Sequence, residues 1–458
     1  MSAELAPNAT AGPAAARIVR PATRLRGELH LPGDKSISHR ALMLAALAEG
    51  QSRISGAGDG ADVRSTAGIV ARLGVRVVRR RWDARTVDYV VDSPGADGLV
   101  EPDGDLDCGN SGTSLRLFAG LVAGLPMTCV LDGDDSLRSR PVARIIDPLR
   151  SMGAELHGRR GDTLPPVTVV GHTPLRSVEV ATTVPSAQVK SSILLAALRA
   201  TGRTTIRESV ATRDHTERML RARGVRVDAS ADAEGATVSL EGGQVVRAID
   251  ERIPGDPSAA AFWLVAGAAH PDAELTLRQV GVNPTRRAVI DLLRRMGARI
   301  DEQPRGGDTA SADDRAGEPT ADLTVRSSDL RAIDLGAGDV AAAIDEIPVL
   351  CLAAANAHGR TTIRGAAELR HKESDRIAGI ATGLTALGVR VAVDGDDLTI
   401  EGRSTLLGAA VDSQDDHRLA MTFAVAGLLA SGPTTVLRPG SAAVSYPGFF
   451  DDLERISA

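Results

Sequence analysis

The 458-residue sequence contains few aromatic residues, has a mildly acidic net charge and lacks a long apolar run. Phe, Trp and Tyr make up only 2% of the chain, so few side chains are present on which nucleic-acid bases could stack. The formal net charge of −6 opposes binding to nucleic acid, which normally requires a basic surface. No uncharged apolar stretch reaches the roughly 18 residues that a membrane-spanning helix needs. We therefore expect no nucleic-acid and no membrane partner, whereas small anionic ligands stay possible because a local cluster of Arg and Lys can bind them.

Cysteines are scarce as well, and they are widely spaced. Cys108, Cys129 and Cys351 show neither the spacing of a metal site nor a disulfide framework, as is usual in a reducing compartment. Residues 1–16 are rich in Ala and Pro but lack the basic start and the apolar run of a signal peptide. The sequence therefore predicts a cytoplasmic protein.

The most informative pattern that is present is a sixfold internal repeat. In each copy an Ala- and Leu-rich run, typical of a helix, leads through a small turn into a Thr-rich segment that favours a strand. The copies cover residues 44–55, 117–131, 194–207, 263–277, 352–364 and 423–437.

A second helix follows in each copy. In the first five copies it is amphipathic and ends in a glycine before a short apolar strand, at Gly74, Gly153, Gly224, Gly297 and Gly388. In the sixth copy, residues 449–456 fit the same helix. Two helices and several strands in every unit predict an α/β fold. A chain of this length exceeds one ordinary core, so we expect two domains of three units each.

Residues 303–319 interrupt the repeat between the fourth and fifth copies. They are rich in Gly, Asp and Ala. Such a composition is typical of a surface insertion that contributes little to packing, so we expect no function for this segment.

Polar motifs stand directly before the six Ala/Leu-rich helices, at residues 35–40, 110–113, 186–190, 255–258, 345–346 and 415–418. A helix start carries unpaired N–H donors and about half a positive charge, and it therefore attracts anions. Ser, Asn and Asp at such positions can simply be N-caps. Cations there oppose the helix dipole and predict a bound anion; they are Lys35, Arg40, Lys190 and Arg418. If two domains face one another, these six helix starts predict a shared cleft for a highly negative ligand.

Two charged clusters lie outside the repeat, each directly after a predicted strand. Residues 134–141 follow the second copy, and residues 368–376 follow the fifth, with seven ionisable residues in nine. A charge run is often only a solvated helix face. Because loops after strands frequently carry function, we interpret both clusters as parts of the site.

Seven motifs in a fixed order give the chain a specific resemblance to the 5-enolpyruvylshikimate-3-phosphate synthase family, from about residue 24 to residue 456. They occupy residues 31–36, 109–113, 140–141, 186–191, 212–217, 372–376 and 416–418. The resemblance implies a two-domain inverted α/β barrel, in which each domain has three βαβαββ units with pseudo-threefold symmetry. It implies one domain at residues 35–252, a discontinuous second domain at residues 1–34 plus 253–458, and an active site in the cleft between them.

The resemblance also implies a reaction. Members of this family transfer the enolpyruvyl group of phosphoenolpyruvate to the 5-hydroxyl of shikimate 3-phosphate and release phosphate, by addition and elimination. The reaction is a step of the shikimate pathway, which leads to chorismate and the aromatic amino acids. It uses no metal and no organic cofactor, and we expect a monomer whose partners are these small-molecule substrates. Such chemistry needs a carboxylate base, a separate acid and a dense positive field.

Matched residue by residue, the resemblance implies roles for particular side chains. Asp345 resembles the base at the 5-hydroxyl, Glu373 the group that handles the methylene proton, and Lys35 a cation that neutralises phosphate and shuttles a proton. Shikimate 3-phosphate is expected at Lys35, Ser36, Arg40, Ser186, Ala187, Gln188, Thr212, Arg213, Asp345 and Lys372. Phosphoenolpyruvate is expected at Lys35, Gly112, Arg140, Gln188, Arg376 and Arg418. The three arginines suit a carboxylate and a phosphate, because guanidinium groups pair bidentately with both.

Three positions depart from the family pattern. Val444 stands where many relatives have a lysine, Leu117 replaces a frequent proline, and His371 replaces a common apolar residue. We expect these changes to alter affinity and helix placement and not the type of reaction. Gly112, in contrast, fits the pattern and leaves room beside phosphoenolpyruvate, so we expect glyphosate to compete there.

Two alternatives compete with this interpretation. The sister enzyme, UDP-N-acetylglucosamine enolpyruvyl transferase, shares the fold, but many of its members use a loop cysteine where this chain has residues 134–137. A non-catalytic anion-binding protein on the same scaffold would not need both Asp345 and Glu373. In every case helix starts of like charge face one another, so we expect the domains to stand apart without ligand.

Overall fold

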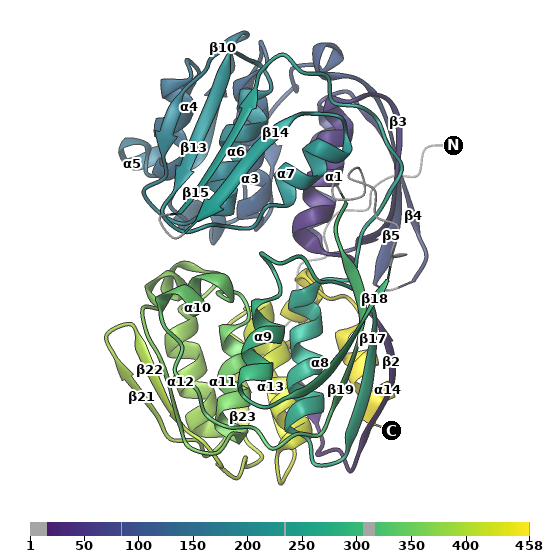
Figure 1. The fold of residues 1–458 in the computed structure, drawn as a ribbon, viewed down its shortest axis with the longest axis vertical. Helices are drawn as coiled ribbons and strands as arrows, with labels where there is room; N and C mark the ends of the chain where they lie inside the picture. The colour runs from purple at the N-terminus through teal and green to yellow at the C-terminus, as the bar shows by residue number, and fades with distance from the viewer. Residues whose placement is uncertain (1–15, 84, 233–234, 306–316, 458) are drawn as a thin grey trace.

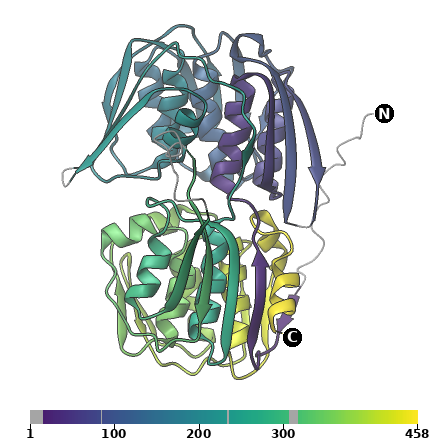
Figure 2. The ribbon, with the colours of Figure 1, turned by 45° about the vertical axis from the view of Figure 1, so that its right-hand side comes forward.

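The computed structural model describes residues 16–83, 85–232, 235–305 and 317–457. These residues form two α/β lobes joined at a narrow waist (Figure 1), and a view from another side shows the same two lobes (Figure 2). Most of the expected insertion, residues 306–316, lies outside the described residues.

Six sheets of three or four strands contain the predicted repeat, three in each lobe. In the first lobe, one sheet has the spatial order β16 (Glu251–Arg252), β3 (Glu49–Gly58), β5 (Thr86–Pro94) and β4 (Arg76–Arg81). The second sheet has the order β6 (Leu106–Asp107), β7 (Thr128–Asp132), β9 (Leu164–Val170) and β8 (Glu155–Gly158). The third has the order β11 (Glu179–Ala181), β13 (Arg203–Glu208), β15 (Gly235–Glu241) and β14 (Val227–Asp232). In the second lobe, the four-stranded sheet has the order β18 (Arg299–Arg305), β19 (Thr320–Arg326), β17 (Ala273–Gly281) and β2 (Leu25–His30). One three-stranded sheet has the order β20 (Arg360–Ile363), β22 (Asp397–Glu401) and β21 (Val391–Asp394). The other has the order β1 (Ala16–Val19), β24 (Thr434–Leu437) and β23 (Ala410–Asp412). A pair of short strands, β10 (Leu175–Arg176) and β12 (Ala200–Thr201), also belongs to the first lobe.

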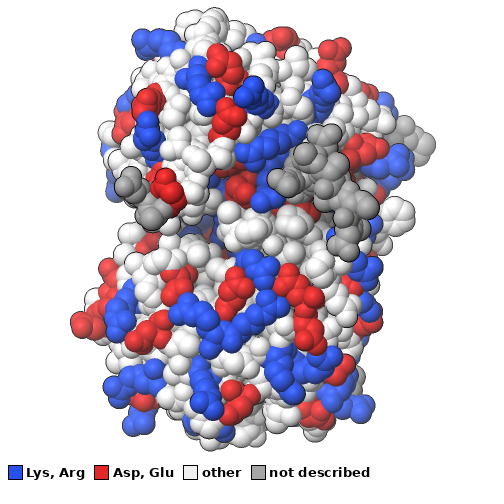
Figure 3. All heavy atoms as spheres, in the orientation of Figure 1, with Lys and Arg blue, Asp and Glu red and all other residues white. Residues whose placement is uncertain are grey.

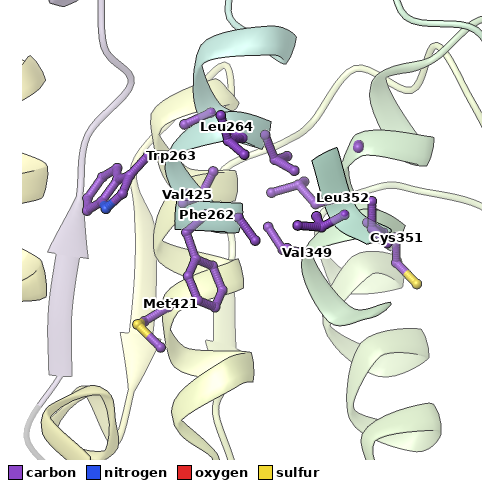
Figure 4. Packing of buried hydrophobic residues seen from close by; sticks show 14 of the residues in the cluster. Phe262, Trp263, Leu264, Val349, Cys351, Leu352, Met421 and Val425 are labelled. Carbon is purple, nitrogen blue, oxygen red and sulfur yellow. The ribbon is translucent and has the colours of Figure 1, made fainter. Parts of the chain in front are cut away.

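Each unit is built around one long, buried helix. These helices are α1 (Lys35–Leu47), α3 (Gly112–Ala123) and α6 (Ala187–Ala197) in the first lobe, and α8 (Pro257–Ala269), α11 (Ile347–Asn356) and α13 (His417–Leu429) in the second. Twelve of the 13 residues of α8 are buried, as expected for a helix that is apolar on all sides. Figure 4 shows Phe262 of α8, Val349 of α11 and Met421 of α13 packed together in the middle of the second lobe. The helices thus fill the interior and the sheets form the outside of each lobe.

The contact between α3 and α6 depends on a glycine. A Cβ added at Gly120 would lie 2.0 Å from the backbone oxygen of Ser192, which is far inside van der Waals contact. Any side chain at residue 120 would therefore push the two central helices apart.

A second, amphipathic helix in each unit confirms the other half of the predicted repeat. These helices are α2 (Ala61–Arg72), α4 (Ala143–Ser151), α7 (His215–Ala222), α9 (Ala288–Arg295), α12 (Arg376–Ala386) and α14 (Phe449–Ser457). The glycines predicted at the ends of the first five all have positive φ, between 82° and 106°, the backbone region that glycine adopts without strain. Shorter helical segments are α5 (Arg159–Asp162), α10 (Ala337–Ala342), η1 (Ala96–Gly98), η2 (Leu137–Ser139), η4 (Ala367–His371) and η5 (Pro439–Val444). Within the described ranges, no helix is both long and apolar enough to cross a membrane.

The chain passes between the lobes by exchanging strands. In the second, third and sixth units the strand after the central helix pairs in parallel with the strand just before that helix. In the first and fourth units the partners are swapped, so that β2 precedes α1 but pairs with β17, and β16 precedes α8 but pairs with β3. The two crossing segments run side by side, where Gly33 pairs with Gly255.

The buried apolar side chains form two separate clusters. One extends from Ile37 to Ile253, and the other combines residues 19–31 with residues 259–456. We therefore propose the domain bounds expected above, residues 35–252 and residues 1–34 plus 253–458; the separate clusters support this division.

Candidate active site

The six predicted helix starts are confirmed, and residues near them meet between the lobes. Side-chain oxygens cap five of the six helices by accepting backbone N–H groups, at Asp34, Ser111, Ser186, Asp256 and Asp416. Figure 3 shows a recess between the lobes, with basic side chains in it. Capping accounts for the Ser and Asp residues of the motifs. It does not account for the cations, whose roles depend on the groups that they contact.

Three ion pairs join the lobes across this recess. Arg213 Nη2 lies 2.8 Å from Asp345 Oδ2, Arg144 Nη1 lies 3.4 Å from Glu368 Oε1, and Arg140 Nη1 lies 3.8 Å from Glu373 Oε1. The structure therefore differs from the expected open form. Like charges at the helix starts do face one another, but carboxylates of the second lobe lie among them. These carboxylates attract the arginines of the first lobe, so the lobes attract each other at these contacts and do not repel.

Asp345 lies just before α11, and cations surround it. Besides Arg213, Lys372 Nζ and Arg376 Nη1 each lie 3.6 Å from Asp345 Oδ1. Burial alone would raise the pKa of this carboxyl, but the nearby charges of Lys372, Arg213, Arg418 and Arg376 hold it well below its ordinary value. Without ligand, Asp345 is therefore a weak base.

This low pKa predicts a contribution of Asp345 to acid stability. A group whose folded pKa lies below its unfolded value of about 3.9 stabilises the fold above that pH, and the contribution disappears as the pH falls through the folded pKa. The free energy of unfolding of the wild type should therefore fall more steeply below about pH 3.9 than that of Asp345→Asn. Urea unfolding at several pH values measures this difference, and parallel curves for the two proteins would contradict it.

Arg376 connects the two carboxylates that are expected to exchange protons. It is the first residue of α12 and is 1% exposed. Its Nη2 donates to Glu373 Oε2 at 2.6 Å, its Nε donates to Asp416 Oδ2 at 2.8 Å, and its Nη1 faces Asp345. For Glu373, as for Asp345, burial raises the pKa but is outweighed, here chiefly by Arg376 and also by Arg140, so the pKa lies well below its ordinary value. Arg376 thus contributes to keeping both carboxylates ionised in the ligand-free site, as the main cation for Glu373 and one of several for Asp345.

Lys35 and Arg40 extend from the start of α1. Lys35 Nζ donates to Asp62 Oδ2 at 3.1 Å. Arg40 donates to the hydroxyls of Thr216 at 2.7 Å and Ser191 at 2.8 Å, and to the carbonyl of Ser36 at 3.0 Å. Within the described residues these are neutral partners, and burial lowers the Arg40 pKa to about 10. Arg40 is thus a buried cation without a directly bonded carboxylate, as an anion site requires.

Gly112, Gln188 and Arg140 come together at the starts of α3 and α6. Gln188 Nε2 donates to Thr113 Oγ1 at 3.0 Å, and Arg140 Nη2 donates to Asn110 Oδ1. A Cβ at Gly112 would lie 3.5 Å from Arg140 Nη1 and 3.0 Å from Arg116 Nη1. Gly112 therefore leaves two guanidinium groups accessible beside the helix start.

Four other expected binding residues have local partners. Ser36 offers its carbonyl to Arg40, Ser186 caps α6, and Ala187 is the first residue of that helix. The Thr212 hydroxyl donates to Glu208 Oε1 at 2.5 Å within the first lobe. The expected role of Thr212 in substrate binding therefore has no support from its hydroxyl, which is already engaged.

The prediction that Lys190 marks a bound anion is wrong. Lys190 is 2% exposed and pairs with Glu217 at 2.8 Å and Glu208 at 2.9 Å. Burial tends to lower its pKa, but these two carboxylates raise it above the ordinary value. Its counter-charges are fixed parts of the first lobe, so this lysine is structural.

Arg418 lies at the start of α13, 5% exposed. Its Nη1 is 3.9 Å from Glu346 Oε1, and its Nε has no hydrogen-bond partner among the described residues. The neighbouring His417 is neutral at physiological pH, because burial lowers its pKa to about 3. An anion bound beside Arg418 would supply the hydrogen-bond partner that its Nε lacks.

Comparison with known proteins agrees with the geometry. The sequence profile of the family described as EPSP synthase (3-phosphoshikimate 1-carboxyvinyltransferase) matches residues 19–453. The chain belongs to this family. A 3-phosphoshikimate 1-carboxyvinyltransferase of Gloeobacter violaceus is 49% identical over 439 residues, covering 96% of this chain and 98% of the relative. One of Bacillus cereus is 44% identical over 442 residues, covering 96% and 99%. The structure of an EPSP synthase from Acinetobacter baumannii superimposes with a TM-score of 0.83 at 38% identity, covering 96% of this chain and 98% of that one.

Membership of the EPSP synthase family confirms the two-domain inverted α/β barrel with three units per domain. The residue roles expected from the resemblance stay predictions. Two charged residues near the site were missed by sequence reasoning, Arg116 and Arg286, and Glu346 was placed in a motif but given no role.

Arg116 stands one helical turn after Gly112, a spacing that could have revealed it. Its Nη1 donates to Gln188 Oε1 at 2.6 Å. Burial, followed by the charges of Arg144 and Arg140, lowers its pKa to about 9. Arg286 Nη1 donates to Glu346 Oε1 at 3.1 Å, but its position between β17 and α9 has no recognisable signal in a single sequence.

Proposed function

We propose that the protein transfers the enolpyruvyl group of phosphoenolpyruvate to the 5-hydroxyl of shikimate 3-phosphate and releases phosphate. The observation that carries this proposal is the arrangement of Asp345, Arg376 and Glu373. Two carboxylates of the second lobe share one buried guanidinium and face cations of the first lobe. A binding protein for two anions gains nothing from these carboxylates, whereas an acid–base enzyme needs both.

The substrates supply what the ligand-free site lacks. Shikimate 3-phosphate carries its phosphate to Arg213 and Lys372, and phosphoenolpyruvate carries a phosphate and a carboxylate to Arg140, Arg376 and Arg418. Each bound anion offsets the cations that depress the carboxylate pKa values. Substrate binding therefore raises the pKa of Asp345 and Glu373 toward the range in which they can exchange protons.

The addition step joins the two substrates. The 5-hydroxyl oxygen bonds to carbon 2 of phosphoenolpyruvate and its proton passes to Asp345. The electron pair of the double bond takes a proton from protonated Glu373, so that the methylene becomes a methyl group. Cations around the phosphate and the carboxylate, with Lys35 among them, stabilise the charge that develops.

The elimination step reverses the role of Glu373. This carboxylate removes a proton from the new methyl group, the double bond re-forms, and the carbon–oxygen bond to phosphate breaks. The leaving phosphate takes up the proton held by Asp345, with Lys35 as the relay. Both carboxylates then return to their starting states.

Several further properties belong to this proposal. The protein acts as a cytoplasmic monomer, its only partners are its small-molecule substrates, and it uses no cofactor. The sister reaction on UDP-N-acetylglucosamine is less favoured, because the curated relatives are named 3-phosphoshikimate 1-carboxyvinyltransferase. In addition, Cys108, Cys129 and Cys351 are buried, so none of them serves as a loop cysteine.

The test is phosphate release by the purified protein given phosphoenolpyruvate with and without shikimate 3-phosphate. We expect release only when both are present. Equal release without shikimate 3-phosphate, or with UDP-N-acetylglucosamine in its place, would overturn the proposal.

Gly112→Ala tests the space beside phosphoenolpyruvate. The added methyl would lie 3.0 Å from Arg116 Nη1 and 3.5 Å from Arg140 Nη1, so the Arg116 guanidinium must shift by a few tenths of an ångström while Arg140 stays in ordinary contact. Glyphosate is longer than phosphoenolpyruvate, so we expect it to need the space that the methyl would occupy. We expect the inhibitor to weaken at least tenfold more than the substrate, a difference of about 1.4 kcal/mol. Inhibition curves measure this ratio, and equal losses for both ligands would place the inhibitor elsewhere.

A further inference from the structure

A cluster of polar side chains joins the lobes close to the two crossing segments. Asp214 and His215 stand at the start of α7 in the first lobe, Asn283 and Thr285 follow β17 in the second, and Glu318 precedes β19. We call these five residues the hinge clamp. The end of β17 adjoins one crossing segment, since the Gly281 N–H donates to the Gly255 carbonyl at 2.9 Å.

The hinge clamp consists of two linked contacts. In the first, Asn283 Nδ2 donates to Asp214 Oδ1 at 2.7 Å, while the Asp214 backbone N–H donates to Thr285 Oγ1 at 3.2 Å. In the second, His215 Nδ1 and Glu318 Oε1 are 2.7 Å apart. Asn283 connects the two, because its Nδ2 also donates to Glu318 Oε2 at 2.9 Å.

These contacts are shielded from water. His215 and Asn283 are each 1% exposed, and the Glu318 side chain is 9% exposed. Hydrogen bonds to a shielded carboxylate are stronger than those at the surface, and loss of one partner leaves the other unsatisfied. Glu318 belongs to the segment for which composition predicted little packing value, and that expectation is wrong for this residue.

The hinge clamp fixes a residue of the candidate site. Arg213 directly precedes Asp214, and its guanidinium reaches across the waist to Asp345. On its other side, the Thr212 carbonyl accepts a hydrogen bond from the structural Lys190 at 3.2 Å. The backbone around Arg213 is therefore held by both lobes at once.

We propose that the hinge clamp positions Arg213 for the phosphate of shikimate 3-phosphate. The inference rests on the proposed function and deepens it. His215, Asn283 and Glu318 act through Arg213 and are positioning residues. Without them the segment before α7 keeps only the Thr285 contact and the Arg213–Asp345 ion pair to the second lobe, so it is held less firmly and substrate binding must order it. Asp345, Glu373 and Lys35 stay in place, so the chemical step at saturation is little affected.

Glu318→Ala, Glu318→Gln and Glu302→Ala form the test set. Glu302 is a matched control, since it accepts from Arg287 and Arg294 within the second lobe and is similarly shielded, at 18% exposure. We expect Glu318→Ala to raise the KM for shikimate 3-phosphate about tenfold, with kcat changed less than about twofold. Glu318→Gln, whose amide oxygen can still accept from Asn283, should fall between the wild type and the alanine variant. Glu302→Ala should match the wild type.

Combination with Arg213→Ala separates positioning from general loosening. If Glu318 acts through Arg213, its removal adds little once Arg213 is absent, so the two KM increases should combine to much less than their product. Multiplicative effects, or an unchanged KM in both Glu318 variants of an active enzyme, would overturn the inference; Glu318→Gln keeps the test valid if Glu318→Ala does not fold. A wild type that does not turn over shikimate 3-phosphate would instead refute the proposed function itself.

Discussion

Asp345→Ala should reduce turnover about a thousandfold, the loss typical of removing a general base. In the ligand-free site this carboxylate is surrounded by Arg213, Lys372 and Arg376. Removal of the carboxylate leaves Arg213 and Lys372 without their fixed counter-charge, and the phosphate of shikimate 3-phosphate can replace it. The lost contact to the 5-hydroxyl weakens the binding of shikimate 3-phosphate, and the stronger attraction between its phosphate and the freed cations strengthens it. Because the two effects oppose each other, we expect the affinity for shikimate 3-phosphate to change by less than about tenfold.

Single-turnover kinetics and direct titration with shikimate 3-phosphate measure the two effects separately. Asp345→Asn should behave like the alanine variant in turnover, since an amide keeps the shape but does not accept the proton. Asp334→Ala is the matched control, because this carboxylate lies in the same lobe, is 60% exposed and pairs with Arg364 at 3.8 Å. Near-normal turnover in either Asp345 variant would remove this residue from the mechanism.

Glu373→Gln should cause a loss of similar size while leaving the site assembled. The glutamine oxygen can still accept from Arg376, and Arg376 is held independently by Asp416 at 2.8 Å. What the variant lacks is a group that gives a proton to the methylene carbon and takes it back, which accounts for about two to four powers of ten in rate.

Proton exchange provides a specific readout for Glu373. With the wild type in D2O, deuterium should enter the methylene group of the transferred enolpyruvyl group during turnover, because the addition step creates a methyl group that is later deprotonated as phosphate leaves. The variant should lose this exchange in parallel with turnover. Glu368→Gln is the control, since Glu368 lies in the same charged cluster but is half exposed and pairs with Arg144. Exchange at the wild-type rate in Glu373→Gln would assign the proton to another residue.

The fold was predictable from the sequence because it rests on repetition. Each unit repeats the same local signals, so a weak preference for a helix or a glycine-ended turn was supported by five further copies. Gly74 and Gly388 illustrate this, since both have a φ of 88° at equivalent turns. The exchange of β2 and β16 between lobes was implied only by the domain bounds of the family resemblance and not by the repeat, because strand pairing depends on contacts between distant parts of the chain.

The position of Lys35 at a helix start was predictable from the repeat, whereas Arg376 was identified through its charged cluster and the family resemblance; the roles of both stay predictions. The candidate site was not predictable where the partner of a charge decides its role. Lys190 and Arg40 both stand near helix starts, yet Lys190 meets two carboxylates and Arg40 meets hydroxyls and a carbonyl. Those partners lie on other elements, so a single sequence does not distinguish an anion-binding cation from a structural one. Glu318 was missed for the same reason. The composition of residues 303–319 predicts a solvent-exposed segment, whereas the contacts of Glu318 lie across the hinge.

The proposed transfer itself is tested most directly by following the carbon atoms. The purified protein is given phosphoenolpyruvate labelled with carbon-13 together with shikimate 3-phosphate, and the products are examined by nuclear magnetic resonance. We predict one equivalent of phosphate and one product that carries the labelled enolpyruvyl group in an ether bond at the 5-oxygen of shikimate 3-phosphate. Label that appears as free pyruvate, or that is transferred to UDP-N-acetylglucosamine and not to shikimate 3-phosphate, would contradict the proposed reaction.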